Sequence, residues 1–441
     1  MKSGLGARLG DRLAGLSDRR FMALVYLTAL ALYMIGLWLH LPNGGGNVYN
    51  GITEVFQQRI CPPPLIDPYL QVPSCTVSFL SVPYIQSFNE YPVITAMFMY
   101  VMGVSGGSLP GDLFTNYYLL TGAVLIIPTL LGIRELMKII EIRRTPRSRI
   151  LWYFVVTPTF LIMTLVNWYV IGVYFTLYGI RRYLEGGSRL WAGVLFGLSA
   201  ASNFVTAVPA LGLFIHSKTT KERVVLAGAA LGTYAAINAP FFVLNGGLWL
   251  QSFHYVYTWN IENSWMQAIL INLYSPYRHI IPPIVFGGFV VEMLWLRYRR
   301  KTDDPLAFAF LAMFGYTFAT YVYPPHLNLV LLPFFVLLPV TNSYREFLAF
   351  DVLNALIVIL GFSEVLLAFG INYYSVFHPV SSITYMSAVF WIEAVRSLWQ
   401  GKFALVNGIP GLPALPWRRR EKAKPAMPGE GGATLREQQH G

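Results

Sequence analysis

Long apolar stretches, separated by short polar or basic segments, run through most of this chain. The first is 21–41 and the next of comparable length is 113–137, each close to the roughly 20 residues that a helix needs to cross a bilayer. Together with the stretches that follow, they predict an all-α polytopic membrane protein with about 12 membrane segments. The later segments are expected at 150–166, 169–180, 190–215 (two segments), 224–244, 277–296, 305–322, 327–339, 350–371 and 381–398.

The apolar stretch at 93–105 is different, because it is too short to cross and is followed by glycine and serine. A stretch of this length predicts a helix that lies in the membrane interface. We therefore expect a large first outer loop, 42–112, that carries interfacial helices.

The stretch 190–215 has basic residues at both ends, and its 26 residues are too many for one crossing and too few for two. This pattern predicts a broken helical hairpin with Ser202 and Asn203 at its tip. Polar backbone at membrane depth is tolerated where it lines a cavity, so the tip is a candidate cavity position.

Lysine and arginine mark the cytoplasmic loops of membrane proteins, so they orient the predicted segments. Of the 32 Lys and Arg residues, all but Arg59 and Arg278 fall on one side when the chain is threaded in this way. The pattern predicts a multi-pass protein of the cell membrane with both termini in the cytoplasm.

Composition supports this class, since 12% of the residues are charged, against about 25% in soluble domains. A net charge of +11 would favour nucleic acid as a partner of a soluble protein. Here membrane orientation accounts for it, so lipid is the expected partner and nucleic acid is not. The predicted organisation is a basic N-terminus (1–20), a membrane domain (21–407) with a second outer loop (245–276), and a disordered cytoplasmic tail (408–441).

The two cysteines, Cys61 and Cys75, both lie in the predicted first outer loop. Disulfides persist outside the cytoplasm, so we expect a structural bridge between them that restricts the unfolded chain. Two cysteines alone are an incomplete zinc site. We assign no metal ligands, although a divalent metal remains possible as a cofactor.

Polar residues on the predicted outer side are the candidates for chemistry, because the inner charges are explained by orientation. The sequence has no phosphate-binding glycine loop, no HExxH and no nucleophile elbow. The outer acids are Glu54, Asp67, Glu90, Asp112 and Glu262; an isolated one such as Asp112 is most simply a solvated loop charge.

Several motifs resemble, in the same order along the chain, those of GT-C fold glycosyltransferases, in the polyprenyl-phosphate-mannose-dependent branch, family 87. The similar stretches are PYIQSFNEYPVITAMFMY (83–100), NWY (167–169), AGVLFGLSAASNF (192–204), NAPFFVLNGGLWLQSF (238–253), IENSW (261–265) and YPPHLNLVLLP (323–333).

The resemblance implies transfer of a hexose, mannose in that family, from a polyprenyl-phosphate donor to a glycan, lipid or protein acceptor at the outer face. Such transfer needs a base for the acceptor hydroxyl and cations or a metal for the departing phosphate. On this basis the catalytic candidates are Glu90, Glu54 and Asp67. The substrate-binding candidates are Arg59, Tyr91, Asn203, Glu262, Trp265, Arg278 and His326.

Three positions depart from the family pattern: Gly51 and Tyr169 stand where the family has Asp, and Asn203 stands where it has Lys. The chemistry of position 51 would then pass to Glu54, which would share its helical face, or to Asp67. Two alternatives to an active transferase follow. The protein is a non-catalytic GT-C-like binding or partner subunit, or it is a lipid-linked sugar transporter.

Overall fold

The computed structural model of the chain describes residues 15–42, 50–60, 80–270, 274–299, 303–338, 340 and 344–361, all within one compact unit that spans residues 1–405. In these ranges the protein is mostly helical and contains no β-strand, only two isolated β-bridges. The expectations for Cys61, Cys75, Asp67, the Arg59 side chain, the segment 381–398 and the tail 408–441 fall outside the described residues.

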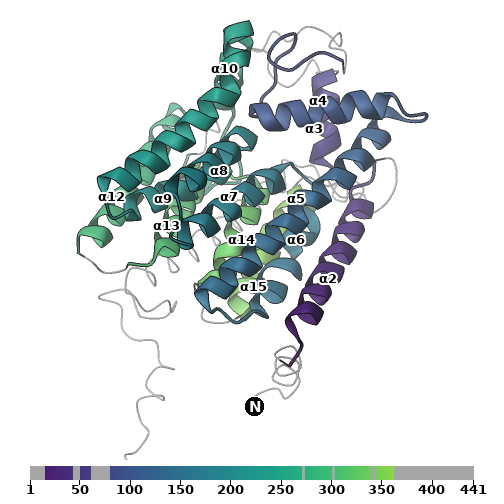
Figure 1. Cartoon of the computed structure of the whole chain (residues 1–441). Helices are drawn as coiled ribbons and strands as arrows, with labels where there is room; N and C mark the ends of the chain where they lie inside the picture. Colours follow the sequence, from purple (N-terminus) through teal and green to yellow (C-terminus); the bar gives the residue numbers. More distant parts are fainter. Residues whose placement is uncertain are drawn as a thin grey trace, which may run out of the picture. The chain divides into compact units, whose positions relative to one another are not determined.

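Many of the helices lie along the predicted apolar stretches, and Figure 1 shows their arrangement. The prediction of one continuous segment at 150–166 is wrong, because this stretch holds a π-helical turn and a six-residue helix with a break between them. The π-helical turn Leu151–Val155 precedes α6, and the 3-10 turns η2, η3 and η4 span Phe204–Ala207, Pro276–His279 and Pro325–Leu327. The α-helices are α2 (Asp18–Leu39), α3 (Gly51–Ile60), α4 (Val93–Gly107), α5 (Leu113–Arg143), α6 (Pro158–Met163), α7 (Tyr169–Leu184), α8 (Arg189–Ser202), α9 (Pro209–His216), α10 (Thr220–Thr258), α11 (Met266–Ile269), α12 (Ile281–Tyr298), α13 (Pro305–Ala319), α14 (Asn328–Leu337) and α15 (Tyr344–Gly361).

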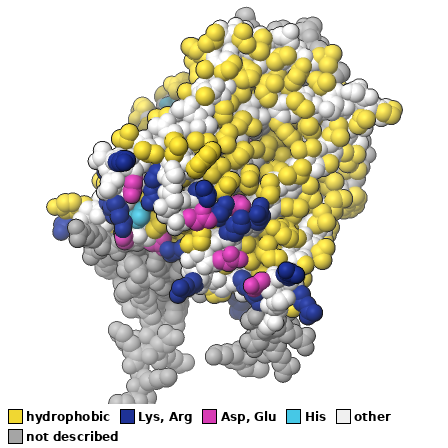
Figure 2. All heavy atoms as spheres, in the orientation of Figure 1, with side chains coloured by type: hydrophobic (Ala, Val, Ile, Leu, Met, Phe, Trp, Pro, Cys, Tyr) yellow, Lys and Arg dark blue, Asp and Glu magenta, His cyan; other side chains and the backbone are white. Residues whose placement is uncertain are grey.

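Three described helical segments are long and apolar enough to cross a membrane: Asp18–Leu39, Thr220–Thr258 and Pro276–Tyr298. Their outward faces carry large apolar side chains, such as Leu27 on α2 and Val243 on α10. Figure 2 shows apolar side chains over most of the visible face, with the charged ones gathered toward one end. Apolar surface of this extent is unusual on a soluble monomer and fits contact with lipid.

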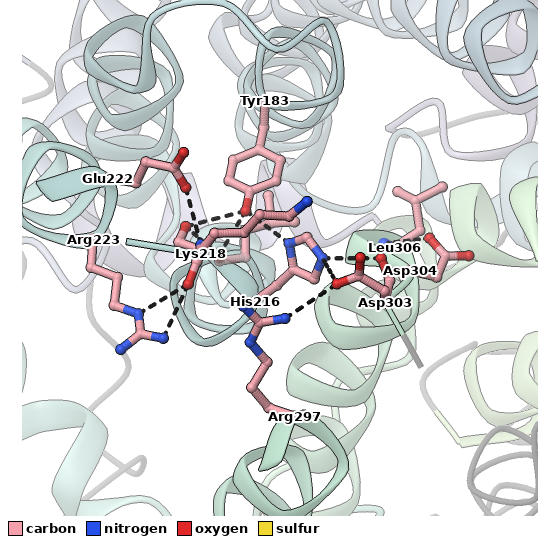
Figure 3. A network of polar contacts seen from close by, with 11 residues as sticks. Tyr183, His216, Lys218, Glu222, Arg223, Arg297, Asp303, Asp304 and Leu306 are labelled. Atoms are coloured by element: carbon pink, nitrogen blue, oxygen red, sulfur yellow. Dashed lines mark hydrogen bonds and ion pairs between the residues drawn. The ribbon is translucent and has the colours of Figure 1, made fainter. Parts of the chain in front are cut away.

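The charged end, which we call the basic end, is tied together by a polar network (Figure 3). The Tyr183 hydroxyl and the His216 Nδ1 atom share a hydrogen bond of 3.0 Å. The His216 Nε2 atom lies 3.0 Å from the Asp303 carbonyl oxygen, and Arg297 donates to the Asp303 carboxylate at 3.2 Å. The network joins the ends of α7, α9 and α12 to the segment that precedes α13.

The predicted interfacial stretch is helix α4, which lies across the ends of its neighbours rather than along them (Figure 1). Pro92 is its N-cap residue. Its Thr95 hydroxyl donates to the Ser202 carbonyl oxygen at 2.6 Å, and its end at Gly106 packs so closely that a Cβ there would lie 2.9 Å from the Tyr117 amide nitrogen. The helix therefore braces the end of α8.

The helix predicted to break at Ser202 and Asn203 does so at that point. Asn203 is extended (φ −156°, ψ 116°), and its Oδ1 caps the following turn by accepting the Val205 N–H at 3.1 Å. Both ends of the segment return to Tyr183: its carbonyl oxygen accepts from Arg189 at 2.7 Å and its hydroxyl lies 3.1 Å from the Ser217 Oγ. The chain thus folds back at Asn203 as a hairpin.

The second predicted outer loop, 245–276, is largely helical at its start, which corrects that expectation. Helix α10 continues to Thr258 across a kink at Asn245 (φ −154°, ψ 79°). The Asn245 Oδ1 accepts the Leu248 N–H at 3.2 Å, so Asn245 acts as the N-cap of a new helical stretch. The Asn-Gly-Gly triplet bends the helix here without ending it.

Candidate functional site

A cavity of about 470 Å³ lies at the end of the bundle where the hairpin tip, α4 and the α10 kink meet. This volume is within the roughly 300–1,000 Å³ that small-molecule pockets occupy. Described side chains from six separate parts of the chain line it: the segment before α4, the start of α7, the hairpin tip, α10 with its end, α13 through Tyr316, and the loop 320–327.

Four of the predicted site residues line this cavity: Glu90, Tyr91, Asn203 and His326. Tyr169, one of the substituted family positions, lines it as well. The start of α7 and the loop 320–327 meet through the rings of Tyr169 and His326, whose centroids are 4.4 Å apart in an edge-to-face contact. Fold-back at Asn203 and the turn before α4 bring these positions together.

The segment before α4 is fixed by its own polar contacts. The Asn89 Oδ1 accepts the Tyr91 N–H at 2.9 Å. The Tyr91 hydroxyl then accepts from the Asn167 Nδ2 at 3.1 Å, and its ring meets that of Trp168 edge to face at 5.0 Å. Glu90 is held between these anchored neighbours.

The cavity wall carries little charge. Of the described residues that line it, Glu90 is the one carboxylate, and none is Lys or Arg. Burial lowers the pKa of His326 to about 3, so its imidazole is neutral at physiological pH. The wall therefore offers hydrogen bonds and one acid, but no permanent cation.

Tyr169 and Asn203 lie in the same cavity wall, and both residues are buried. The resemblance led us to expect an Asp and a Lys at these positions. Both side chains are instead neutral hydrogen-bonding groups.

Glu262 lies behind the wall and supports it. Its backbone N–H donates to the Tyr321 carbonyl oxygen at 2.9 Å, and its carbonyl oxygen accepts from the Tyr323 N–H at 2.8 Å. This bridge holds the loop 320–327 in place. Burial raises the pKa of the Glu262 carboxyl to about 7, so a large share of it is protonated near neutral pH.

Two other predicted contacts lie outside the lining. The Trp265 Nε1–H donates to the Phe318 carbonyl oxygen at 2.7 Å, and the indole stacks on the Phe318 ring with centroids 5.6 Å apart. Glu54 is exposed on α3, whereas Gly51, one turn earlier, is buried. The two residues are three positions apart on this one helix, and neither lines the cavity.

Arg278 stands near the rim. Its guanidinium donates to the carbonyl oxygens of Tyr274 and Ser275 at 2.5 and 3.3 Å. The ring of its neighbour His279 meets that of the lining residue Tyr321 edge to face, with centroids 5.3 Å apart. Arg278 is thus the described cation that we associate with this site.

Much of the lining comes from α10 and its end, through Tyr234, Trp249, Phe253, Tyr255 and Trp259. Of these aromatic residues, the sequence singled out Trp259 as a candidate for sugar contact, and the other four were not predicted. The signal that could have found them is the density of aromatic residues on both sides of Asn245-Gly246-Gly247. Over the ranges the structure describes, no group of three or more His, Cys, Asp and Glu side chains is placed to hold a metal ion.

The chain is therefore a largely helical protein with helices suited to a membrane and one large aromatic cavity. No family model, curated protein or solved structure matches it.

Proposed function

We propose that this protein is an integral membrane glycosyltransferase of the GT-C type that transfers a hexose from a polyprenyl-phosphate donor to an acceptor at the outer face. The observation that carries the proposal is that stretches far apart in the sequence, each similar to a family motif, contribute to the same cavity. These stretches are 83–100, 167–169, 192–204 and 323–333. Motifs that matched by chance would have no reason to meet.

In this proposal Glu90 is the general base. It is the carboxylate of the described lining, and a carboxylate within hydrogen-bond reach of the acceptor hydroxyl can take its proton during transfer. The neighbouring amides of Asn167 and Asn203 would orient sugar hydroxyls, since amides both donate and accept hydrogen bonds. The sugar is mannose if the resemblance extends to substrate.

The donor phosphate lies at the rim rather than deep in the cavity. The described lining has no Lys or Arg, and burying a phosphate without a cation is costly. Arg278, close to Tyr321, can match phosphate oxygens with its guanidinium and stabilise the leaving group as the glycosidic bond breaks. The lipid chain would then run along the apolar surface of α10.

The distribution of charged side chains supports the proposed placement in the cell membrane. In this placement the basic end faces the cytoplasm, as expected for Lys- and Arg-rich loops, and the cavity opens at the outer face. The about 12 membrane segments belong to this proposal, with the shorter helices α13 and α14 paired as crossings.

A second function is favoured by the two neutral side chains of Tyr169 and Asn203 in the cavity wall. If the family chemistry depends on charge at these positions, the protein binds a lipid-linked sugar without transferring it and serves as a partner subunit. The cavity would be the same, but Glu90 would not be needed for any turnover.

The two functions are separated by a transfer assay. Membranes containing the protein are supplied with radiolabelled polyprenyl-phosphate mannose or glucose, and label in acceptor material is counted. A transfer rate at least 100-fold lower in Glu90→Gln than in the wild type would support the enzyme. A general base contributes roughly 10²–10⁴-fold to the rate. The matched control is Glu141→Gln, an exposed acid on α5, which should transfer at the wild-type rate.

A result in which neither donor gives transfer and Glu90→Gln behaves as the wild type in cells rejects the enzyme. Donor binding without transfer would then establish the partner subunit.

A further inference from the structure

Trp249 is locked across the kink in α10. Its Nε1–H donates to the Asn238 Oδ1 at 2.9 Å, which lies on the other side of Asn245. Asn238 is 5% exposed, and its Nδ2 donates to the Tyr234 carbonyl oxygen at 2.8 Å. Because the one polar atom of the indole is satisfied within the protein, Trp249 offers the cavity a carbon surface in a fixed position.

Other aromatic side chains hold the indole in place. Its ring meets Phe242 and Phe253 edge to face, with centroids 5.4 and 4.8 Å apart, and it packs beside a small cluster that contains Tyr84. Together with Tyr234, Phe253, Tyr255 and Trp259 it forms what we call the α10 wall of the cavity.

A second group of lining residues has the opposite character. We call Glu90, Asn167, Tyr169, Asn203 and His326 the polar wall. It combines a carboxylate, two amides, a phenol and an imidazole that is neutral at physiological pH, all of which hydrogen-bond to hydroxyl groups. One cavity therefore has both an apolar aromatic surface and a set of hydrogen-bonding groups without a permanent cation.

We infer that the cavity binds an uncharged glycosyl unit, with a C–H face of the sugar on Trp249 and its hydroxyls toward the polar wall. A pyranose has this two-sided chemistry, and a preformed apolar pocket with a few convergent polar groups is the usual form of a small-molecule site. The inference deepens the proposed function, on which it rests for the origin of the sugar.

Charge sets the selectivity. An anionic sugar such as a uronate would bring its carboxylate near Glu90 in a lining without Lys or Arg, and a buried charge without a partner is unfavourable. The site should therefore prefer neutral hexoses over uronic acids that carry the same chain.

The inference is tested by calorimetric titration of the purified protein in lipid nanodiscs with four short-chain amphiphiles below their micellar concentrations. They are octyl β-glucoside and octyl β-mannoside, octyl β-glucuronide, and octyl tetraethylene glycol, which has the same chain without a sugar. We expect saturable binding of the two neutral glycosides. The Kd of the glucuronide should be at least about tenfold higher, and the glycol ether should not bind.

The variants address Trp249 directly. Trp249→Ala should weaken glycoside binding by about tenfold, as loss of a stacked aromatic surface implies, whereas Trp249→Phe, which keeps a ring at the site, should lose less. Trp38→Ala is the matched control, because Trp38 on α2 is 57% exposed and is absent from the cavity lining. Its affinity should equal that of the wild type.

Equal binding of the glycol ether would overturn the inference, because the cavity would then hold an apolar chain. Tighter binding of the glucuronide would overturn the selectivity. Wild-type affinity in both Trp249 variants would remove Trp249 from the site. The two proposals can fail separately. Glycoside binding without sugar transfer would support the glycosyl site and reject the enzyme. Sugar transfer that does not depend on Trp249 would support the enzyme and reject the site at Trp249.

Discussion

Tyr169 and His326 meet edge to face in the wall of the cavity, with their ring centroids 4.4 Å apart. The contact joins the start of α7 to the loop that leads into α14, two parts of the chain separated by more than 150 positions. Asn203, at the hairpin tip, lines the same cavity. Three resemblance motifs thus converge through side chains that carry no charge at neutral pH.

Charged substitutions at Tyr169 and Asn203 should have effects on stability that depend on each other. Tyr169→Asp alone places an unpaired carboxylate in a buried site and should lower the free energy of unfolding by about 3–5 kcal/mol. Tyr169→Asp with Asn203→Lys forms a pair and should recover at least about 1 kcal/mol of that loss. Thermal unfolding in detergent measures both. Additive losses in the double variant would show that the two side chains do not interact.

The close approach of α7 to the hairpin tip depends on Gly172. A Cβ there would overlap the side chain of Thr206, so Gly172→Ala should destabilise the protein by about 1–3 kcal/mol. Gly228→Ala on α10 is the matched control, since a Cβ there meets nothing within 4 Å. It should be neutral or stabilising by about 0.5–1 kcal/mol. Similar unfolding temperatures for the two variants would contradict this packing.

Glu262 should make stability depend on pH. Burial raises the pKa of its carboxyl from 4.5 to about 7, so between these values the folded state binds more protons than the unfolded state. The stabilisation is complete below pH 4.5, falls as pH rises, and is lost above about 7.

Glu262→Gln has no such titration. Relative to the wild type it should gain stability between pH 5 and pH 8, by up to about 3 kcal/mol. Melting temperatures of the two proteins across this range give the difference directly. A difference that does not change with pH would show that Glu262 titrates normally.

Arg278 should act on the donor but not on the sugar site. Arg278→Gln removes the cation at the rim, so KM for the polyprenyl-phosphate donor should rise roughly tenfold, as expected for loss of a charge-assisted hydrogen bond. Octyl glucoside affinity should not change. Lys221→Gln, an exposed residue at the basic end, is the control. Equal effects of the two variants on KM would remove Arg278 from the donor site.

Much of the helical arrangement could be predicted from the sequence, because apolar length and polar interruptions determine it locally. The starts of α5 at Leu113 and α7 at Tyr169 coincide with the predicted ones. The break at Asn203 was predicted because basic residues flank a stretch of intermediate length. The stretch that begins at Val93 was predicted not to cross the membrane because it is short, and in the structure it forms the transverse helix α4.

The path of α10 beyond Asn245 could not be predicted in this way. Asn-Gly-Gly is a turn signal. The predicted helix therefore ended at position 244, although apolar residues follow the triplet. The helix continues because Asn245 caps it and Trp249 bonds back to Asn238, which are contacts that form only in the folded chain. The aromatic residues that α10 itself contributes to the cavity, such as Trp249 and Phe253, were missed with it.

The predicted site residues fall into two groups: some line the cavity, and others point away from it and bond elsewhere in the protein. Glu90, Tyr91, Asn203 and His326 line the cavity. Trp265 and Glu262 come from a stretch that also resembles a family motif, but one bonds to Phe318 and the other bridges to Tyr321 and Tyr323. The resemblance placed this stretch near the cavity. Which of its side chains reach the cavity depends on the β-bridge between Glu262 and Val322 and on the turn at Asn263 (φ 50°).

The central claim is that Glu90 serves sugar transfer in this cavity. Its most direct test is the initial rate at which the purified protein in nanodiscs releases polyprenyl phosphate from polyprenyl-phosphate mannose in the presence of acceptor extract, for the wild type and for Glu90→Gln. We predict a measurable wild-type rate and a loss of at least 100-fold in the variant, with donor affinity changed by less than about threefold. Equal rates in the two proteins, with correct folding of both, would contradict the claim.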